Sequence, residues 1–166
     1  MTTRRSTLGL AAALALTPAL VRAQGIGLAE RRAIAAYRQE KYPAIETGIQ
    51  GAAGFAVPVE VEWDQLTLPG DAPYYARDDY FGKTIFEPLT AALRSITADA
   101  MGRDALRAKL QRIHIRYDEK TAPASNYANG LTFANGTLGI NWRPYANPAD
   151  VADRTQALTQ LLEKNL

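Results

Sequence analysis

The chain of 166 residues has no cysteine and a single histidine, His114. Zinc and most transition metals are held by several histidine or cysteine side chains, which this sequence does not supply. The acidic loop that binds calcium in EF-hand proteins is missing, as are the glycine motifs that cradle phosphates and dinucleotides. We therefore expect no bound metal and no cofactor.

A large net charge is also lacking. The sequence has 19 basic and 17 acidic residues, and three of the arginines but none of the acids fall within the first 23 residues. Residues 24–166 therefore carry 16 − 17 = −1. Proteins that bind nucleic acid or anionic membranes usually have a basic surface. We expect no nucleic acid partner, and consider an unknown protein or a small polar ligand instead.

Long uncharged apolar runs are limited to one, LGLAAALALTPALV at 8–21. This run follows Arg4 and Arg5 and ends shortly before the small residue Ala23, which is the layout of a secretory signal peptide. It is shorter than the ~20 residues that cross a membrane. We expect cleavage after Ala23, no stable membrane insertion afterwards, and a periplasmic or secreted protein.

The stretch TRRSTL at 3–8 resembles a twin-arginine export signal, in which paired arginines precede a mild apolar run. That resemblance implies that the protein folds before it crosses the membrane. Export by the general secretory route is the alternative.

Two periodicities predict the secondary structure of the remaining chain. Apolar residues at helical spacing predict helices over 28–53, 86–97 and 102–110, the first of them broken or kinked at Pro43. Strict alternation predicts strands at FAVPVEVEWD (55–64) and RIHIRYD (112–118), and Pro58 favours an edge position or a bulge for the first. A last helix is predicted from Asn147, which can cap it, and Pro148, which suits its first turn.

The dipeptide Asn135-Gly136 is typical of a two-residue type I′ hairpin turn. A turn there pairs Phe133 with Leu138 and Leu131 with Ile140, so that every large apolar residue falls on one face. The other face is small and polar, and we expect it to extend the charged face of the neighbouring strands. Since the last three strands follow one another closely, we predict a single α+β domain at 24–166, with a mainly antiparallel four-stranded sheet and helices packed on one face.

The outward faces of the first two predicted strands carry opposite charges. The first presents Glu60 and Glu62, and the second presents Arg112, His114 and Arg116. Opposite charges on neighbouring strands stabilise a sheet by roughly 0.2–1 kcal/mol per pair. We therefore predict that these strands are antiparallel neighbours, and we take their open face as a candidate binding surface.

A second candidate is the loop DAPYYARDDYFG at 71–82. Tyr74, Tyr75 and Tyr80 combine apolar rings with hydroxyl groups, and Asp78 and Asp79 add charge, which suits contacts with a polar ligand or a protein. The alternative is that some of these rings fill one end of the hydrophobic core and anchor the loop.

No complete catalytic set is evident in the sequence. The serines of residues 24–166, Ser95 and Ser125, lie outside any nucleophile motif. We therefore predict a non-enzymatic binding or interaction module that uses the open sheet face or the 71–82 loop. Two alternatives stay open: a small exported hydrolase that uses glutamate or aspartate carboxylates with His114, and an assembly factor that pairs through a sheet edge.

Replacing Arg4 and Arg5 together by lysine tests the export route. We expect the double variant to stay inside the cell, while the parent chain is exported and begins at Gln24, because the twin-arginine route recognises the arginine pair and not charge alone. Cell fractionation with N-terminal sequencing measures both results. Export of the lysine variant at the parental level would assign the chain to the general secretory route.

Overall fold

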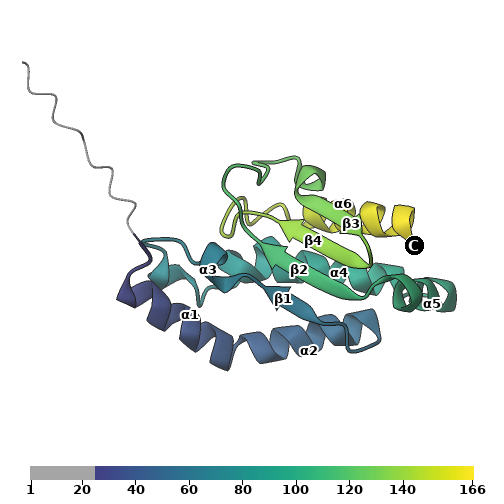
Figure 1. Ribbon diagram of the computed structural model, residues 1–166, viewed down its shortest axis with the longest axis horizontal. Coiled ribbons are helices and arrows are strands. Elements are labelled where there is room, and N and C mark those ends of the chain that lie inside the picture. Colours follow the sequence, from purple (N-terminus) through teal and green to yellow (C-terminus); the bar gives the residue numbers. More distant parts are fainter. Residues whose placement is uncertain (1–24) are drawn as a thin grey trace, which may run out of the picture.

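The computed structural model describes residues 25–166 (Figure 1), so the predicted signal peptide lies outside the described residues. Within that range, four strands form one sheet, accompanied by six α-helices. The strands are β1 (Val59–Val61), β2 (Arg112–Arg116), β3 (Leu131–Ala134) and β4 (Thr137–Asn141). The α-helices are α1 (Leu28–Glu40), α2 (Tyr42–Ala53), α3 (Trp63–Leu66), α4 (Glu87–Ile96), α5 (Ala100–Lys109) and α6 (Val151–Asn165). Two short 3₁₀ turns, η1 (Ala72–Tyr74) and η3 (Tyr127–Gly130), and a π-helix, η2 (Asp78–Phe86), complete the chain.

The sheet is mixed and mostly parallel, with the strand order β1-β2-β4-β3. Strand β2 pairs in parallel with both β1 and β4, and only β3 and β4 are antiparallel. The prediction of a mainly antiparallel sheet was therefore wrong. Residues 62–111 form a long helical crossover between β1 and β2, which is the connection that parallel strands require. In addition, β4 lies next to β2, whereas β3, which follows β2 in the sequence, lies on the far side of β4.

The predicted hairpin is confirmed in turn and in register. Asn135 and Gly136 have φ values of 49° and 71°, as a type I′ turn requires. Leu131 pairs with Ile140, and the next large residues toward the turn pair in the same way. The apolar pattern of these strands therefore fixed their register, because a shift by one residue would move the apolar side chains to the other face.

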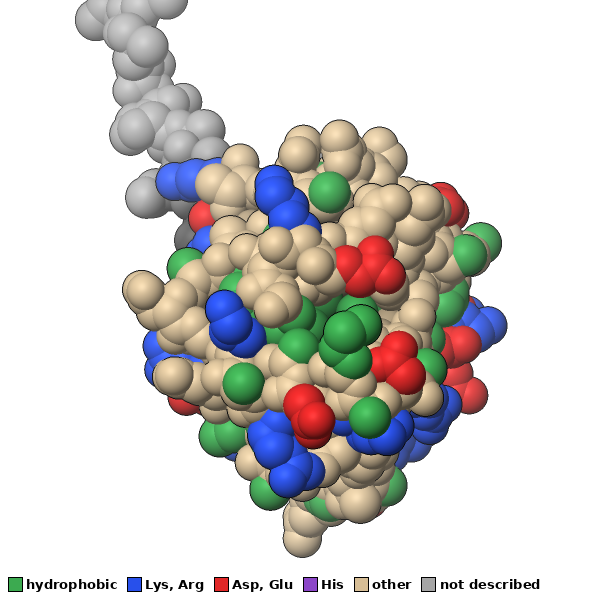
Figure 2. Space-filling model, turned by 90° about the vertical axis from the view of Figure 1, so that its right-hand side faces the viewer, with side chains coloured by type: hydrophobic (Ala, Val, Ile, Leu, Met, Phe, Trp, Pro, Cys, Tyr) green, Lys and Arg blue, Asp and Glu red, His purple; other side chains and the backbone are tan. Residues whose placement is uncertain are grey.

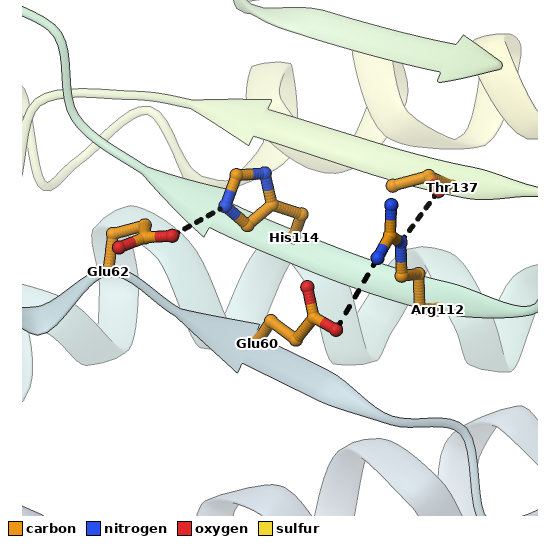
Figure 3. A network of polar contacts seen from close by, with 5 residues as sticks. All are labelled: Glu60, Glu62, Arg112, His114 and Thr137. Atoms are coloured by element: carbon orange, nitrogen blue, oxygen red, sulfur yellow. Dashed lines mark hydrogen bonds and ion pairs between the residues drawn. The ribbon is translucent and has the colours of Figure 1, made fainter.

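The hydrophobic core lies between the sheet and the helices on one of its faces. Ile113 and Ile115 of β2, and Leu138 and Ile140 of β4, are at most 1% exposed. Figure 1 shows α4 and α6 behind the sheet, and these two helices also pack on each other. The opposite face of β2 carries the charged side chains drawn in Figure 3. One face of the sheet is thus built for the core, and the other is left open.

The break near Pro43 occurs as predicted, since α1 ends at Glu40 and α2 begins at Tyr42 with the proline in its first turn. Gly54 ends α2 in the left-handed conformation, with φ 78°. The first predicted strand is much shorter than expected, with β1 limited to three residues after Pro58. It is an edge strand, as the proline indicated, and the carbonyl of Pro58 accepts a hydrogen bond from Ile113.

The last helix begins at Val151, later than predicted. Asn147 has a left-handed φ of 46°, which no helical residue adopts. Arg154 of α6 is fully buried, and its Nη1 donates to the Asn147 carbonyl at 2.9 Å. Its guanidinium also lies 4.1 Å from the centre of the Tyr127 ring, and burial lowers its pKa. The inward arginine therefore helps to hold residues 147–150 in a turn where the sequence pattern suggested the start of a helix.

Charges of both signs are interspersed on the end of the molecule where α5 and the C-terminus lie. Figure 2 shows this face, with isolated basic and acidic side chains among uncharged ones. That distribution matches the near balance of charge in residues 24–166. Among residues 25–166, no helix combines the length and apolar character needed to cross a membrane.

Replacing Gly136 by alanine tests the hairpin turn. We expect the Gly136→Ala variant to lose about 1–2 kcal/mol of unfolding free energy, because a left-handed conformation is costly for a residue with a Cβ. The matched control is Gly51→Ala in α2, where an added Cβ meets no neighbour within 4 Å. That change should stabilise the protein by about 0.5–1 kcal/mol. Urea unfolding measures both, and a Gly136→Ala variant as stable as the parent would contradict the assigned turn.

Candidate ligand-binding face

Opposite charges pair across β1 and β2 on the open face of the sheet (Figure 3). Arg112 Nη1 lies 3.6 Å from a carboxylate oxygen of Glu60, and His114 Nε2 lies 3.1 Å from Glu62. The predicted adjacency of these strands is confirmed, but their predicted antiparallel direction was wrong. Side chains alternate between faces in either direction, so charge alone did not distinguish the two. Both pairs are substantially exposed and contribute little to stability.

A hollow of about 450 Å³ lies over β2, β4 and β3, next to these ion pairs. Its rim is completed by residues 118–130, the segment that connects β2 to the hairpin. The glutamates of β1 do not line it. The polar side chains that line it from the strands include Arg112, His114, Arg116, Thr132, Thr137 and Asn141.

The floor of the hollow is kept low by Gly139. This residue is the register partner of His114 on one side and of Thr132 on the other. A Cβ at Gly139 would come within 2.4 Å of the Thr132 hydroxyl oxygen. The absence of a side chain at Gly139 thus leaves room for the Thr132 hydroxyl at the centre of the face.

One wall of the hollow is a hydrogen-bonded corner that starts at Asp118. Its carboxylate accepts hydrogen bonds from the Thr121 hydroxyl at 2.8 Å and from the Lys120 amide at 3.0 Å. These two bonds lower the pKa of the Asp118 carboxyl. The side chain of Asn141, which is buried, accepts from the Asp118 amide at 2.8 Å and donates to Thr121 at 2.9 Å. Strand β4 therefore holds the beginning of the connecting segment at the rim.

Arg116 differs from the two other basic residues of β2. Arg112 and His114 each have a glutamate partner, and Arg112 Nε also donates to the Thr137 hydroxyl at 2.9 Å. Within residues 25–166, no carboxylate lies within 4.0 Å of the Arg116 guanidinium. It is exposed, at the opposite end of β2 from Arg112.

The structure separates the residues of the 71–82 segment. Tyr75 is 1% exposed and Tyr80 is fully buried, and their hydroxyls donate to the Leu68 carbonyl and to the Asp71 carboxylate, both at 2.9 Å. Burial raises the pKa of Tyr75 to about 12. These two rings belong to the core, as the alternative interpretation of this segment proposed. The segment is also not a loop, because it enters the π-helix η2 at Asp78.

Tyr74, Asp78 and Asp79 lie at the surface, away from the hollow over the sheet. Tyr74 stacks on Tyr145 with ring centres 5.6 Å apart, and Asp79 pairs with Arg77 at 2.9 Å. Asp78 lines a second hollow, of about 550 Å³, between α2 and the η2–α4 helices. The predicted site residues therefore fall into three places, and only the basic residues of β2 line the hollow over the sheet.

Sequence reasoning missed the contribution of Asp118 and Thr121. An aspartate whose side chain bonds the backbone two residues later is a recognisable turn signal, and DEKT at 118–121 has that form. The sequence does not reveal that Asn141, at the end of β4, forms hydrogen bonds with this turn. Among residues 25–166, no group of three or more histidine, aspartate or glutamate side chains is placed to share a metal ion.

Removing the Thr121 hydroxyl tests the corner. We expect Thr121→Val to raise the pKa of Asp118 toward its ordinary value, because the strongest hydrogen bond to the ionised form is lost. A folded-state pKa below the unfolded value stabilises the protein above the unfolded value, and this stabilisation is lost as the pH falls through the folded value. The variant should therefore lose less stability on acidification.

An NMR titration of the aspartate carboxyl carbons measures that pKa. The control is Thr47→Val on α2, which removes a helical hydroxyl that bonds only the Pro43 carbonyl. An unchanged Asp118 titration in Thr121→Val would show that the corner does not form in solution.

Comparison with family models, with curated proteins and with solved structures found no match to this chain. The case for a function therefore depends on the geometry of the open face.

Proposed function

We propose that the protein is an exported, non-enzymatic binding module that holds a small anionic ligand in the hollow over its sheet. One observation carries this proposal: all three basic side chains of β2 line a single hollow with a glycine floor. Hydroxyl and amide groups from β3, β4 and the 118–130 segment share the same hollow. The export signal predicted from the sequence supports a periplasmic or secreted location for this binding.

The size and chemistry of the hollow favour a small molecule over a protein partner. Ligand sites in proteins are typically concave and about 300–1,000 Å³ in volume, and this hollow falls within that range. A guanidinium presents a planar fork of donors that matches carboxylate and phosphate groups. Arg116 can supply such a fork at the rim, and Arg112, bonded through Nε and Nη1, keeps its Nη2 donors.

The carboxylate hydrolase is a weaker interpretation of the same face. A general acid needs a carboxyl that burial keeps protonated. Glu60 and Glu62 have side chains that are 52% and 50% exposed, and both lie outside the hollow next to basic partners. Ser125 lines a different hollow, beside α6, and so does not meet His114.

Pairing through the β1 edge of the sheet is also less favoured than ligand binding. The edge strand β1 has three residues and follows Pro58, which offers no amide hydrogen. The Tyr42 hydroxyl approaches the carbonyl of Val59 at 3.5 Å and covers part of that edge. A partner strand would find few free backbone groups there.

Titration calorimetry with phosphate, succinate, citrate, glucose and lysine tests the proposal. We expect the anions to bind and the neutral sugar and the cation not to bind. Arg116→Ala should weaken anion binding at least tenfold, since a hydrogen bond to a charged group contributes about 1.5–3 kcal/mol.

The matched control is Arg32→Ala, which removes an exposed arginine from α1, far from the hollow in sequence and structure. It should leave anion binding unchanged. Equal losses in the two variants would indicate a general charge effect and would contradict a site on the sheet.

A further inference from the structure

We infer that the ligand of this hollow carries two acidic groups, one for Arg112 and one for Arg116, joined by a slim uncharged middle that lies over Gly139. This inference rests on the proposed function, and it adds the chemical class of the ligand. The geometry points to α,ω-diacids and related dianions, and not to a compact ion such as phosphate.

The two arginines lie at opposite ends of β2. They occupy its first and last positions, and four residues of a strand span ~13 Å between Cα atoms. Their side chains share a face, because side chains alternate between the two faces of a strand and the two arginines are separated by an even number of residues. The hollow is therefore lined by one arginine from each end of β2.

Arg112 is held at its own end of the hollow. Its Nε donates to the Thr137 hydroxyl, and its Nη1 lies beside Glu60, as Figure 3 shows. Thr137 is also the register partner of Arg112, so this bond keeps the guanidinium close to its own row of the sheet. A guanidinium has five N–H donors, and the Nη2 group is left for a ligand.

Arg116 receives the second acidic group. The one carboxylate that lines the hollow near it, Asp118, already accepts hydrogen bonds from Thr121 and from the Lys120 amide. No Asp118 oxygen lies within 4.0 Å of the Arg116 guanidinium, although the positive charge of Arg116 also lowers the pKa of that carboxyl. Two arginines and one aspartate give the lining a charge of 2 − 1 = +1, which favours an anionic ligand.

The centre of the hollow is suited to an uncharged spacer. The row across the middle of the sheet contains His114, Gly139 and Thr132 in register. Figure 3 shows the His114 ring with one nitrogen directed toward Glu62, 3.1 Å from its carboxylate oxygen. Gly139 adds no side chain to this row, and the Thr132 hydroxyl lies where a Cβ of Gly139 would project. An uncharged spacer would therefore cross the middle of the face over the Thr132 hydroxyl.

A series of dicarboxylates from succinate through adipate and suberate to sebacate tests the inference, each compared with the monocarboxylate of equal chain length. We expect one range of lengths to bind at least tenfold more tightly than the matched monoacids. Arg112→Ala and Arg116→Ala should each reduce the diacid to the affinity of the monoacid, and Arg32→Ala should change neither. Circular dichroism of each variant verifies that it is folded.

The outcomes separate this inference from the proposed function. The two-group ligand is wrong if monoacids and diacids bind equally. It is also wrong if phosphate binds best and its binding needs only one of the two arginines. In both cases anion binding on the sheet stands. If no carboxylate or phosphate binds to the folded parent protein, both are wrong. A diacid preference that survives removal of either arginine would also overturn the inference.

Discussion

The structure depends on the two-faced character of β2, the strand that is bordered by β1 and β4. Its apolar positions, Ile113 and Ile115, are fully buried against the helical layer, and its remaining positions carry Arg112, His114 and Arg116. Because side chains alternate, burying the two isoleucines forces the three basic residues onto the opposite face. The core that stabilises the fold and the basic row of the candidate site are therefore two consequences of one strand.

The features that depend on local chemistry could be predicted from the sequence. The Asn135-Gly136 turn and its register follow from turn geometry and from the apolar alternation, and the helix break follows from Pro43. The adjacency of β1 and β2 also follows, from complementary charges. Their direction does not, because Glu60 meets Arg112 as readily in a parallel pair. Direction is set by the long helical crossover, which joins distant parts of the chain.

The candidate site likewise has one part that the sequence predicts and another that only the structure reveals. The sequence places the basic residues of β2 and the small residues of the hairpin on one face, and the structure joins them in one hollow. The rim at Asp118 and Thr121 depends on hydrogen bonds to Asn141, which is 23 and 20 residues away from them in the chain. The tyrosines of 71–82 illustrate the opposite case. Ring chemistry suits both a ligand and a core, and only the packing of Tyr75 and Tyr80 decides in favour of the core.

We propose that the open face of the sheet is the binding surface. The most direct measurement is an NMR titration of the amide-labelled protein with suberate, followed through the backbone signals of residues 25–166. The account predicts that the largest shifts occur at Gly139, Thr132 and Arg116, around the hollow over the sheet. Shifts centred instead on the hollow between α2 and η2, which Asp78 lines, would contradict it.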